Sequence, residues 1–176
     1  MKKRKVLKFS TLLLGCGFVS FAFMSYARIA RLDLVVNPRC KECFSPAKTH
    51  AGCLIAKDKK ILLVRDSWSK KLGFPAGHHD FGERAFQTAY RETLEETGIR
   101  VVIDEYLYES KATNFRLFKC NIIEETGKHD GEILEFAYVG KEDIRRIIDE
   151  GDARFADQLE FVYQNFETLS RSMSVL

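Results

Sequence analysis

The stretch GHHDFGERAFQTAYRETLEETGI, residues 77–99, decides the fold of the chain and carries most of its recognisable chemistry. It begins as a glycine-bounded loop, and Glu83 follows at the expected start of a helix, where the helix dipole favours an acid. Neither Gly nor Pro interrupts residues 88–97, and Gly98 stands where a left-handed residue commonly ends a helix. The pattern therefore predicts a loop followed by a helix that ends at Gly98.

Three acids share one face of this predicted helix. Glu92, Glu95 and Glu96 are spaced i, i+3, i+4, and like charges at these spacings destabilise a free helix by about 0.2–0.5 kcal/mol per pair. Only Arg91 is near enough to compensate. An exposed acidic surface is one interpretation, and a site for a divalent cation is the other. Carboxylate ligands favour a hard ion, Mg²⁺ or Mn²⁺, over Zn²⁺.

The complete spacing of the stretch favours the cation site. The positions in register are Gly77, Glu83, Arg91, Glu92, Glu95, Glu96, Gly98 and Ile99. In this register the chain resembles the signature box of the Nudix (MutT-like) hydrolases. Two departures, Thr93 for an aliphatic residue and Ala76 within the Pro-Gly-Gly that often opens the box, leave every carboxylate in place. The resemblance covers about residues 49–170.

The resemblance implies both a fold and an activity. The implied fold is α/β: a Nudix α/β/α sandwich with a mixed β-sheet. The implied activity is hydrolysis of the pyrophosphate of a nucleoside diphosphate linked to another moiety, by attack of water on phosphorus with Mg²⁺ or Mn²⁺. Glu92 and Glu96 are the expected metal ligands, Glu95 is a ligand or the base that deprotonates water, and the Gly77 carbonyl completes the set.

The resemblance also suggests supporting and substrate-binding residues. Arg91 is expected to orient Glu83 or Glu95 through a bidentate pair, so Arg91 and Glu83 join Glu95 as catalytic candidates. Many family members use a further acid after the box, for which Glu132 and Glu135 are the candidates. Trp68 lies in the segment that leads to the metal site and fits either stacking on the substrate or packing. The loop histidines His78 and His79 fit either phosphate contacts or solvated positions.

The N-terminus differs from the rest of the chain. Residues 1–27 hold five basic residues and no acid, and residues 9–27 form an uncharged run rich in Leu, Phe, Gly and Val. This pattern predicts a signal peptide cleaved after Ala27 or an uncleaved membrane anchor. Because basic residues stay on the cytoplasmic side, we expect the protein to be exported or membrane-anchored, facing the periplasm or another extracytoplasmic space.

Residues 28–48 form a connector that carries Cys40 and Cys43. One Cys-x-x-Cys pair is half of a zinc site, and an exported protein favours a disulfide between two of Cys40, Cys43 and Cys53. Unpaired structural cysteines are the third possibility. Cys120 falls in a predicted strand and is interpreted as a core residue.

Residues 49–176 form the predicted hydrolase domain. The expected strands are residues 51–56 and 61–65, joined by a turn at 57–60, then 101–103, 106–108, 115–123 and 132–139. The expected helices are the box helix, with Ala85, Ala89 and Tyr90 on its buried side, a short helix ending at Gly151 and a final amphipathic helix over residues 155–166.

Charge excludes one class of partner. The chain has a net charge of +3, but five of its 28 basic residues lie in residues 1–27, which leaves 23 against 25 acids in the remainder. A nucleic-acid-binding face is therefore not expected. The expected partner is a small pyrophosphate substrate, with membrane attachment through residues 9–27, and the alternative function is a membrane-associated, non-catalytic nucleotide- or pyrophosphate-binding module on a Nudix fold. Substrate and oligomeric state are left open.

Overall fold

A computed structural model describes residues 36–45, 50–129 and 131–171. The predicted signal or anchor segment, residues 9–27, and most of the connector lie outside the described residues. None of the helices in the described part of the chain has the length and apolar character needed to cross a bilayer.

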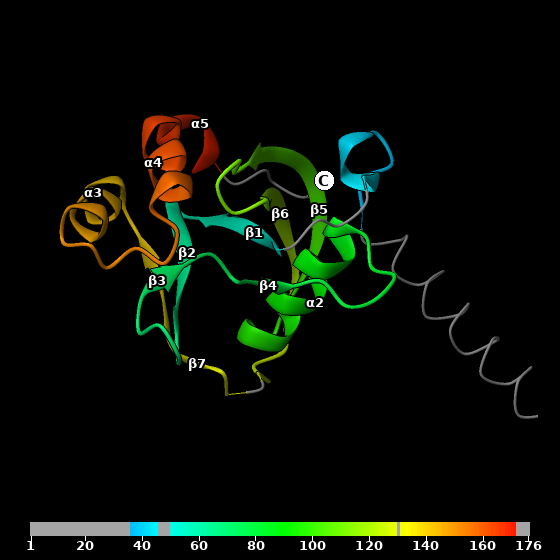
Figure 1. The fold of residues 1–176 in the computed structure, drawn as a ribbon, viewed down its shortest axis with the longest axis horizontal. Coiled ribbons are helices and arrows are strands. Elements are labelled where there is room, and N and C mark those ends of the chain that lie inside the picture. Colours follow the sequence, from blue (N-terminus) through cyan, green and yellow to red (C-terminus); the bar gives the residue numbers. More distant parts are fainter. Residues whose placement is uncertain (1–35, 46–49, 130, 172–176) are drawn as a thin grey trace, which may run out of the picture. The chain divides into compact units, whose positions relative to one another are not determined.

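The described chain forms one sheet system with helices between and after its strands (Figure 1). The strands are β1 (His50–Lys57), β2 (Lys60–Asp66), β3 (Leu72–Gly73), β4 (Ala76–His78), β5 (Ile99–Glu109), β6 (Phe115–Glu125) and β7 (Ile133–Val139). The helices are the 3-10 helix η2 (Glu42–Phe44) and the α-helices α2 (Ala85–Thr97), α3 (Lys141–Asp149), α4 (Ala156–Gln164) and α5 (Phe166–Leu169).

The sheet is mixed, as expected. β1 runs parallel to β6 and antiparallel to β2 and β4, while β5 pairs antiparallel with β6, and β2 pairs antiparallel with β3 and β7. Helix α2 covers one face of the sheet, and the helices α3, α4 and α5 lie on the other side (Figure 1). The α/β/α sandwich predicted from the sequence is confirmed.

Strand β6 shows why both faces of the sheet are covered. Phe115 and Leu117 enter the core under the C-terminal helices, whereas Phe118 and Cys120 enter the core under α2. Successive side chains of a strand point to opposite faces, so this continuous apolar run requires cover on both sides. Both sets of side chains are buried, in agreement with the sandwich that the resemblance implied.

The β1–β2 hairpin confirms the predicted turn. Asp58 and Lys59 both have positive φ values, 51° and 57°. This pair of left-handed residues is the geometry of a type I′ turn, whose twist matches that of the flanking strands. The turn fixes the start of β2 against the end of β1, with Lys60 opposite Lys57.

Helix α2 is held against the sheet by a small apolar stripe. Ala85, Phe86 and Ala89 are buried, and full burial of a Phe side chain contributes about 1.5–3 kcal/mol. Gly98 ends the helix in the left-handed conformation, at φ 69°, and its N–H donates to the Leu94 carbonyl, as predicted. The predicted start was two residues early: Glu83 precedes the helix, because its carboxylate accepts a hydrogen bond from the Asp80 N–H in the preceding turn.

Three other expectations about secondary structure were wrong. Residues 101–103 and 106–108 were expected as separate strands, but both belong to the continuous strand β5, which pairs with β6 through register shifts. Gly77 and His78 were assigned to a loop, but they form part of β4, since they pair with Ala51 and His50 of β1. The final helix was expected to be continuous, but it is divided at Asn165, whose side-chain amide donates to the Phe161 carbonyl at the end of α4. This side-chain bond satisfies a carbonyl at the helix end and competes with continuation of the helix.

The four cysteines of the described region form two disulfides. Cys40 pairs with Cys43, in agreement with the favoured disulfide interpretation. Cys53 pairs with Cys120, so the assignment of Cys120 as a simple core residue was wrong. The strand register explains this pair: Cys120 lies opposite Ile55 in the parallel β1–β6 ladder, so Cys53 and Cys120 are close neighbours on the face under α2.

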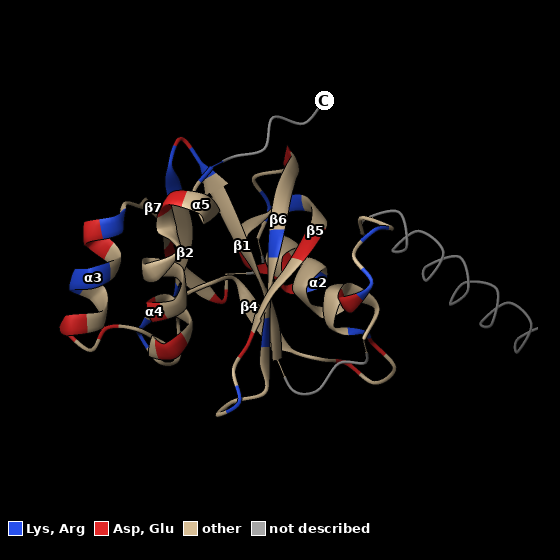
Figure 2. Ribbon diagram, turned by 90° about the horizontal axis from the view of Figure 1, so that it is seen from above, with Lys and Arg blue, Asp and Glu red and all other residues tan. Residues whose placement is uncertain are grey.

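Charges of both signs are mixed along helix α3 (Figure 2). Arg145 pairs with Asp149 of the same helix and with Glu160 of α4, and Arg146 pairs with Asp143. These ion pairs are partly exposed and contribute little individually. Helix α3 therefore presents both signs of charge in balance.

Replacement of Gly52 by Ala is expected to destabilise the domain by about 3 kcal/mol. A Cβ at Gly52 would lie 2.5 Å from the Ala76 Cβ and 2.6 Å from the Pro75 carbonyl oxygen. Both atoms are fixed by the backbone of the neighbouring segment, so relieving the overlap requires a shift of that backbone. The measurement is the free energy of unfolding from urea titration. The control is Gly140→Ala, whose Cβ would meet only Asp143, at 3.6 Å, and which should cost no more than about 1 kcal/mol. Equal losses in both variants would contradict the packing argument.

Candidate functional site

Two of the predicted carboxylates, Glu92 and Glu96, contact β4. Glu96 is buried, and its Oε2 accepts a 2.8 Å hydrogen bond from the Ala76 N–H. The carboxylate of Glu92 lies against Gly77, so closely that a Cβ at position 77 would overlap it. Glycine is therefore required at this position by the close approach of strand and helix, which brings the Gly77 backbone beside the Glu92 side chain.

Arg91 holds this cluster together through its guanidinium. Its Nε and Nη2 donate to the two oxygens of Glu83 at 2.9 and 3.1 Å, which confirms the expected bidentate pair. Its Nη1 donates to Glu92 at 2.7 Å and to Glu95 at 3.0 Å. Nη2 also donates to the carbonyl of His78, at 2.8 Å. Arg91 thereby connects the box loop, β4 and the acidic face of α2, and its contact with Glu92 was not predicted.

The electrostatics of the cluster differ from one acid to the next. Burial alone would raise the pKa of Glu83, but hydrogen bonds from Arg91, the Asp80 N–H and Thr88 outweigh it and hold that pKa below its ordinary value. Burial raises the pKa of Glu92 despite the opposing charge of Arg91. The Glu83 carboxylate raises the pKa of Arg91 further. Glu83 is thus a satisfied anion, whereas ionised Glu92 lacks sufficient compensation.

The acids also differ in access to solvent. Glu96 is buried and Glu92 is mostly buried, whereas the side chain of Glu95 is 46% exposed. A group that exchanges a proton with a reacting water must reach that water. Among the three acids of the helix face, Glu95 is therefore the one most open to a substrate or a water molecule.

The donor set fits a hard divalent cation in its chemistry. Glu92, Glu95, Glu96 and the Gly77 carbonyl supply only oxygen atoms, the ligands that Mg²⁺ and Mn²⁺ prefer. The shortage of positive charge around ionised Glu92 would be relieved by a cation. Within residues 36–45, 50–129 and 131–171, however, no three Cys, His, Asp or Glu side chains already converge as a ligand set. Arg91 instead occupies the space between Glu92 and Glu95.

Glu92→Gln is expected to leave the metal-free protein at least as stable as the wild type at pH 7. The pKa of Glu92 is raised in the folded state, so the stability that this carboxyl contributes is present below its ordinary pKa and is lost as pH rises through its raised pKa. The amide has no charge to bury. The measurement is the melting temperature of both proteins in EDTA at pH 4 and pH 7. A variant that is less stable than the wild type at pH 7 would show that the ion pair with Arg91 outweighs burial.

The candidate substrate-binding residues are more dispersed. Trp68, in the turn between β2 and β3, is 90% exposed. Glu135 pairs with Arg65 at 2.6 Å, and Arg65 also holds Asp152, which ties Glu135 into an ion-pair network at the β2–β7 edge. The backbone carbonyl of Glu132 accepts a hydrogen bond from the Ser67 N–H. None of these contacts involves the acidic face of α2, and the substrate-binding role of the three residues stays a prediction.

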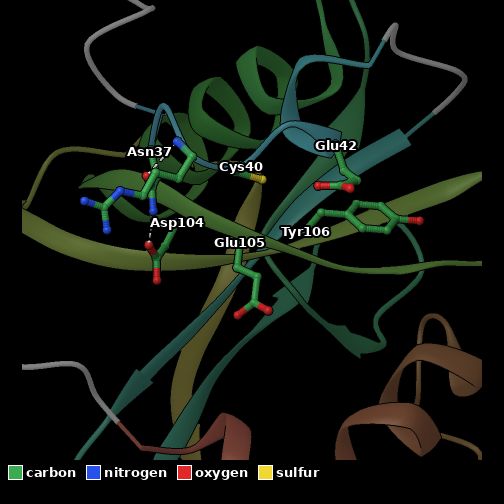
Figure 3. A pocket seen from close by; sticks show the side chains of 7 residues that line it. Asn37, Cys40, Glu42, Asp104, Glu105 and Tyr106 are labelled. Atoms are coloured by element: carbon green, nitrogen blue, oxygen red, sulfur yellow. Dashed lines mark hydrogen bonds between the residues drawn. The ribbon is translucent and has the colours of Figure 1, made fainter.

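A surface pocket lies away from this cluster, between η2 and the middle of β5 (Figure 3). Its lining residues are Asn37, Arg39, Cys40, Glu42, Asp104, Glu105 and Tyr106. The Asn37 side chain donates to Asp104 at 2.9 Å, and Glu42 points toward Tyr106 (Figure 3). The pocket contains none of the residues that the box resemblance singled out.

A family model for the NUDIX domain matches residues 46–159. The chain belongs to the NUDIX family. This Nudix hydrolase carries the box acids on α2, with the Arg91 hydrogen bonds to Glu83, Glu92 and Glu95 at its centre. No curated protein matches the chain.

Solved structures agree with the family assignment. A NUDIX hydrolase from Nitrosomonas europaea is 26% identical, with a TM-score of 0.55 over 73% of this chain and 77% of that chain. An ADP-ribose pyrophosphatase from Streptococcus suis is 17% identical, with a TM-score of 0.54 over 72% of this chain and 96% of that one. A C. elegans Ap4A hydrolase is 23% identical, with a TM-score of 0.53 over 67% and 95% of the two chains. The latter two likenesses concern the fold alone.

Proposed function

We propose that this Nudix hydrolase cleaves the pyrophosphate of a nucleoside diphosphate derivative by attack of water on phosphorus, with Mg²⁺ or Mn²⁺ bound. The observation that carries the proposal is the arrangement of the three acids of α2 around β4 and Arg91. Glu92 lies against Gly77 and Glu96 accepts a hydrogen bond from the Ala76 N–H, while Arg91 donates to Glu92 and Glu95. Structurally similar proteins named as an ADP-ribose pyrophosphatase, a UDP-X diphosphatase and an Ap4A hydrolase support this substrate class.

Glu92 and Glu96 would hold the cation, with the Gly77 carbonyl as a further ligand. When bound, the cation supplies charge neutralisation at the phosphate oxygens. Glu96 is already fixed by its hydrogen bond from the Ala76 N–H, and Glu92 is confined by Gly77, so both donors are pre-positioned by β4. Such positioning lowers the reorganisation needed during reaction.

Glu95 takes a proton from the attacking water in this proposal. Its exposed carboxylate is held in one orientation by the Nη1 of Arg91. Glu83 fixes the other edge of the same guanidinium through two hydrogen bonds, so it acts on the acids through Arg91. Arg91 and Glu83 are thus positioning residues, and we expect their substitution to disturb the orientation of the Glu92 and Glu95 carboxylates.

The test uses the full-length protein in mild detergent with Mg²⁺ or Mn²⁺. Phosphate-containing products are followed across nucleoside di- and triphosphates, nucleotide sugars, dinucleotides and prenyl pyrophosphates, with Glu96→Gln as the blank. Hydrolysis of a nucleoside diphosphate derivative far above the blank, abolished by EDTA, supports the proposal. Absence of hydrolysis across the panel, or equal rates in the blank, would reject it and favour a binding role for the same fold.

We also propose that the protein is exported or anchored through residues 9–27 and faces an extracytoplasmic space. The uncharged run after five basic residues supports this, and the disulfides Cys40–Cys43 and Cys53–Cys120 suit an oxidising compartment. Protease added to intact cells that produce the protein, with the outer membrane permeabilised where one is present, should digest the hydrolase domain. Protection of the domain until the cytoplasmic membrane is broken would contradict this location.

A further inference from the structure

Two histidines from different strands stack on each other beside the carboxylate cluster. His50, the first residue of β1, lies opposite His78, the last residue of β4, and their ring centroids are 3.8 Å apart. A Cβ at Gly77 would point at the Glu92 carboxylate, and the side chains of successive residues in a strand point to opposite faces. The side chain of His78 therefore lies on the face of β4 away from Glu92, together with His50.

Basic groups surround this histidine pair. Burial, followed by the nearby charges of His78, Arg154 and His79, lowers the pKa of His50 to about 4. Phe155, which follows Arg154 in the α3–α4 connection, packs its ring edge-on against His50, with centroids 6.1 Å apart. The groups that act on His50 are thus all basic, and they come from β4, from the box loop and from the α3–α4 connection.

The same cluster contains hydrogen-bonding atoms without partners. The Nδ1 of His50 and the Nη1 of Arg154 are both buried, and neither has a hydrogen-bond partner among the described residues. The Oδ2 of Asp66 forms an ion pair with that Nη1 at 3.4 Å, without a hydrogen bond, and its Oδ1 accepts hydrogen bonds from the Ser69 and Trp68 N–H groups. Unsatisfied buried polar atoms cost free energy, and they cluster where a ligand completes the hydrogen bonding.

Accessibility allows a ligand to reach the cluster. His78 and His79 are exposed, while His50 and Arg154 are only half-buried. His50 and Arg154 are thus the less accessible members of the cluster, and His78 and His79 the more accessible ones. An anion there would accept hydrogen bonds from imidazole and guanidinium N–H groups and would pair with the positive charge of Arg154.

We propose that His50, His78 and Arg154 form a phosphate subsite on the face of β4 opposite Glu92. This inference rests on the proposed function, and it adds the substrate class. β4 ends at His78, whose carbonyl accepts a hydrogen bond from Arg91. A phosphate chain bound at the acids of α2 would therefore need to pass only the end of this strand to reach the subsite. Substrates with phosphates beyond the cleaved pyrophosphate, such as nucleoside triphosphates and dinucleoside polyphosphates, gain this contact. Nucleotide sugars do not.

The first test measures binding of inorganic triphosphate by calorimetry, in metal-free buffer. The full-length protein carries Glu96→Gln throughout, so binding is scored without hydrolysis and independently of the proposed activity. Adding His50→Gln or His78→Gln should raise the Kd at least about tenfold, the loss typical of a hydrogen bond to a charged group. His129→Gln, which replaces an exposed histidine elsewhere, should leave the Kd unchanged. Unchanged affinity in His50→Gln and His78→Gln, or no binding to the parent, would overturn the subsite.

The second test distinguishes a phosphate of the substrate from a free phosphate ligand. In the active protein, His50→Gln should raise the KM for a nucleoside triphosphate about tenfold and leave the KM for a nucleotide sugar unchanged. If His50→Gln weakens triphosphate binding but leaves the KM of each substrate at its wild-type value, the subsite binds a free anion, and the proposed substrate class is overturned. If nothing in the panel is hydrolysed, the proposed function fails while calorimetry still decides whether the subsite exists.

Discussion

Replacement of Glu96 by Gln is expected to lower kcat by about a thousandfold while the domain stays folded. The amide removes the negative charge that a cation requires. It keeps an oxygen that can accept the 2.8 Å hydrogen bond from the Ala76 N–H, so the contact between α2 and β4 survives. The measurements are kcat on the best substrate of the panel and the melting temperature of the same preparation.

A matched substitution separates the loss of one carboxylate from a general effect of charge. Glu150→Gln changes an exposed acid at the end of α3 and should retain the wild-type rate. Glu92→Gln should resemble Glu96→Gln in rate, because both acids lie beside β4. A folded Glu96→Gln protein that turns over at the wild-type rate would remove Glu96 from the proposed ligand set.

The local parts of this site could be predicted from the sequence because their signals are local. The spacing of Glu92, Glu95 and Glu96 places them on one helix face whatever the rest of the chain does. Gly98 ends α2 through its own left-handed conformation, and Ala85 and Ala89 are small enough to allow close packing on the sheet. These features depend on neighbours within a few residues along the chain.

The parts that could not be predicted depend on strand register. Cys53 and Cys120 are 67 residues apart, and only the parallel pairing of β1 with β6 brings them together. His50 meets His78 because β4 pairs with β1, and a strand of three residues bounded by Pro75 and a polar loop leaves no periodic pattern to detect. An isolated histidine at the start of an apolar strand likewise indicates nothing about its partner.

The carboxylate cluster combines contacts that could be predicted from the sequence with contacts that depend on the fold. The box resemblance led us to expect a bidentate pair of Arg91 with Glu83 or Glu95, and the structure shows that pair with Glu83. The hydrogen bond from Arg91 to Glu92 depends on tertiary packing, because Gly77 of β4 lies directly against the Glu92 carboxylate. The resemblance therefore identified the residues, whereas the distribution of hydrogen bonds among them required the fold.

Arg91→Lys is expected to reduce activity by about 10–100-fold and to raise the Mg²⁺ concentration needed for half-maximal rate. The guanidinium donates to Glu83, Glu92, Glu95 and the His78 carbonyl at once, through a planar fork. An ammonium keeps the charge but has one nitrogen, so it cannot satisfy both oxygens of Glu83 and also reach the α2 acids. The freed acids then lose their orientation toward a cation. The measurement is a Mg²⁺ titration of the rate.

The control for this variant is Arg100→Lys, which alters an exposed arginine paired with Glu124 and should leave the Mg²⁺ titration unchanged. A reduced rate at every Mg²⁺ concentration with an unchanged half-maximal point would mean that Arg91 acts on the reaction without acting on the cation. Rate and half-maximal point both equal to those of the wild type would contradict the positioning role. In that case positive charge alone at position 91 is sufficient, because lysine preserves the charge and removes only the fork.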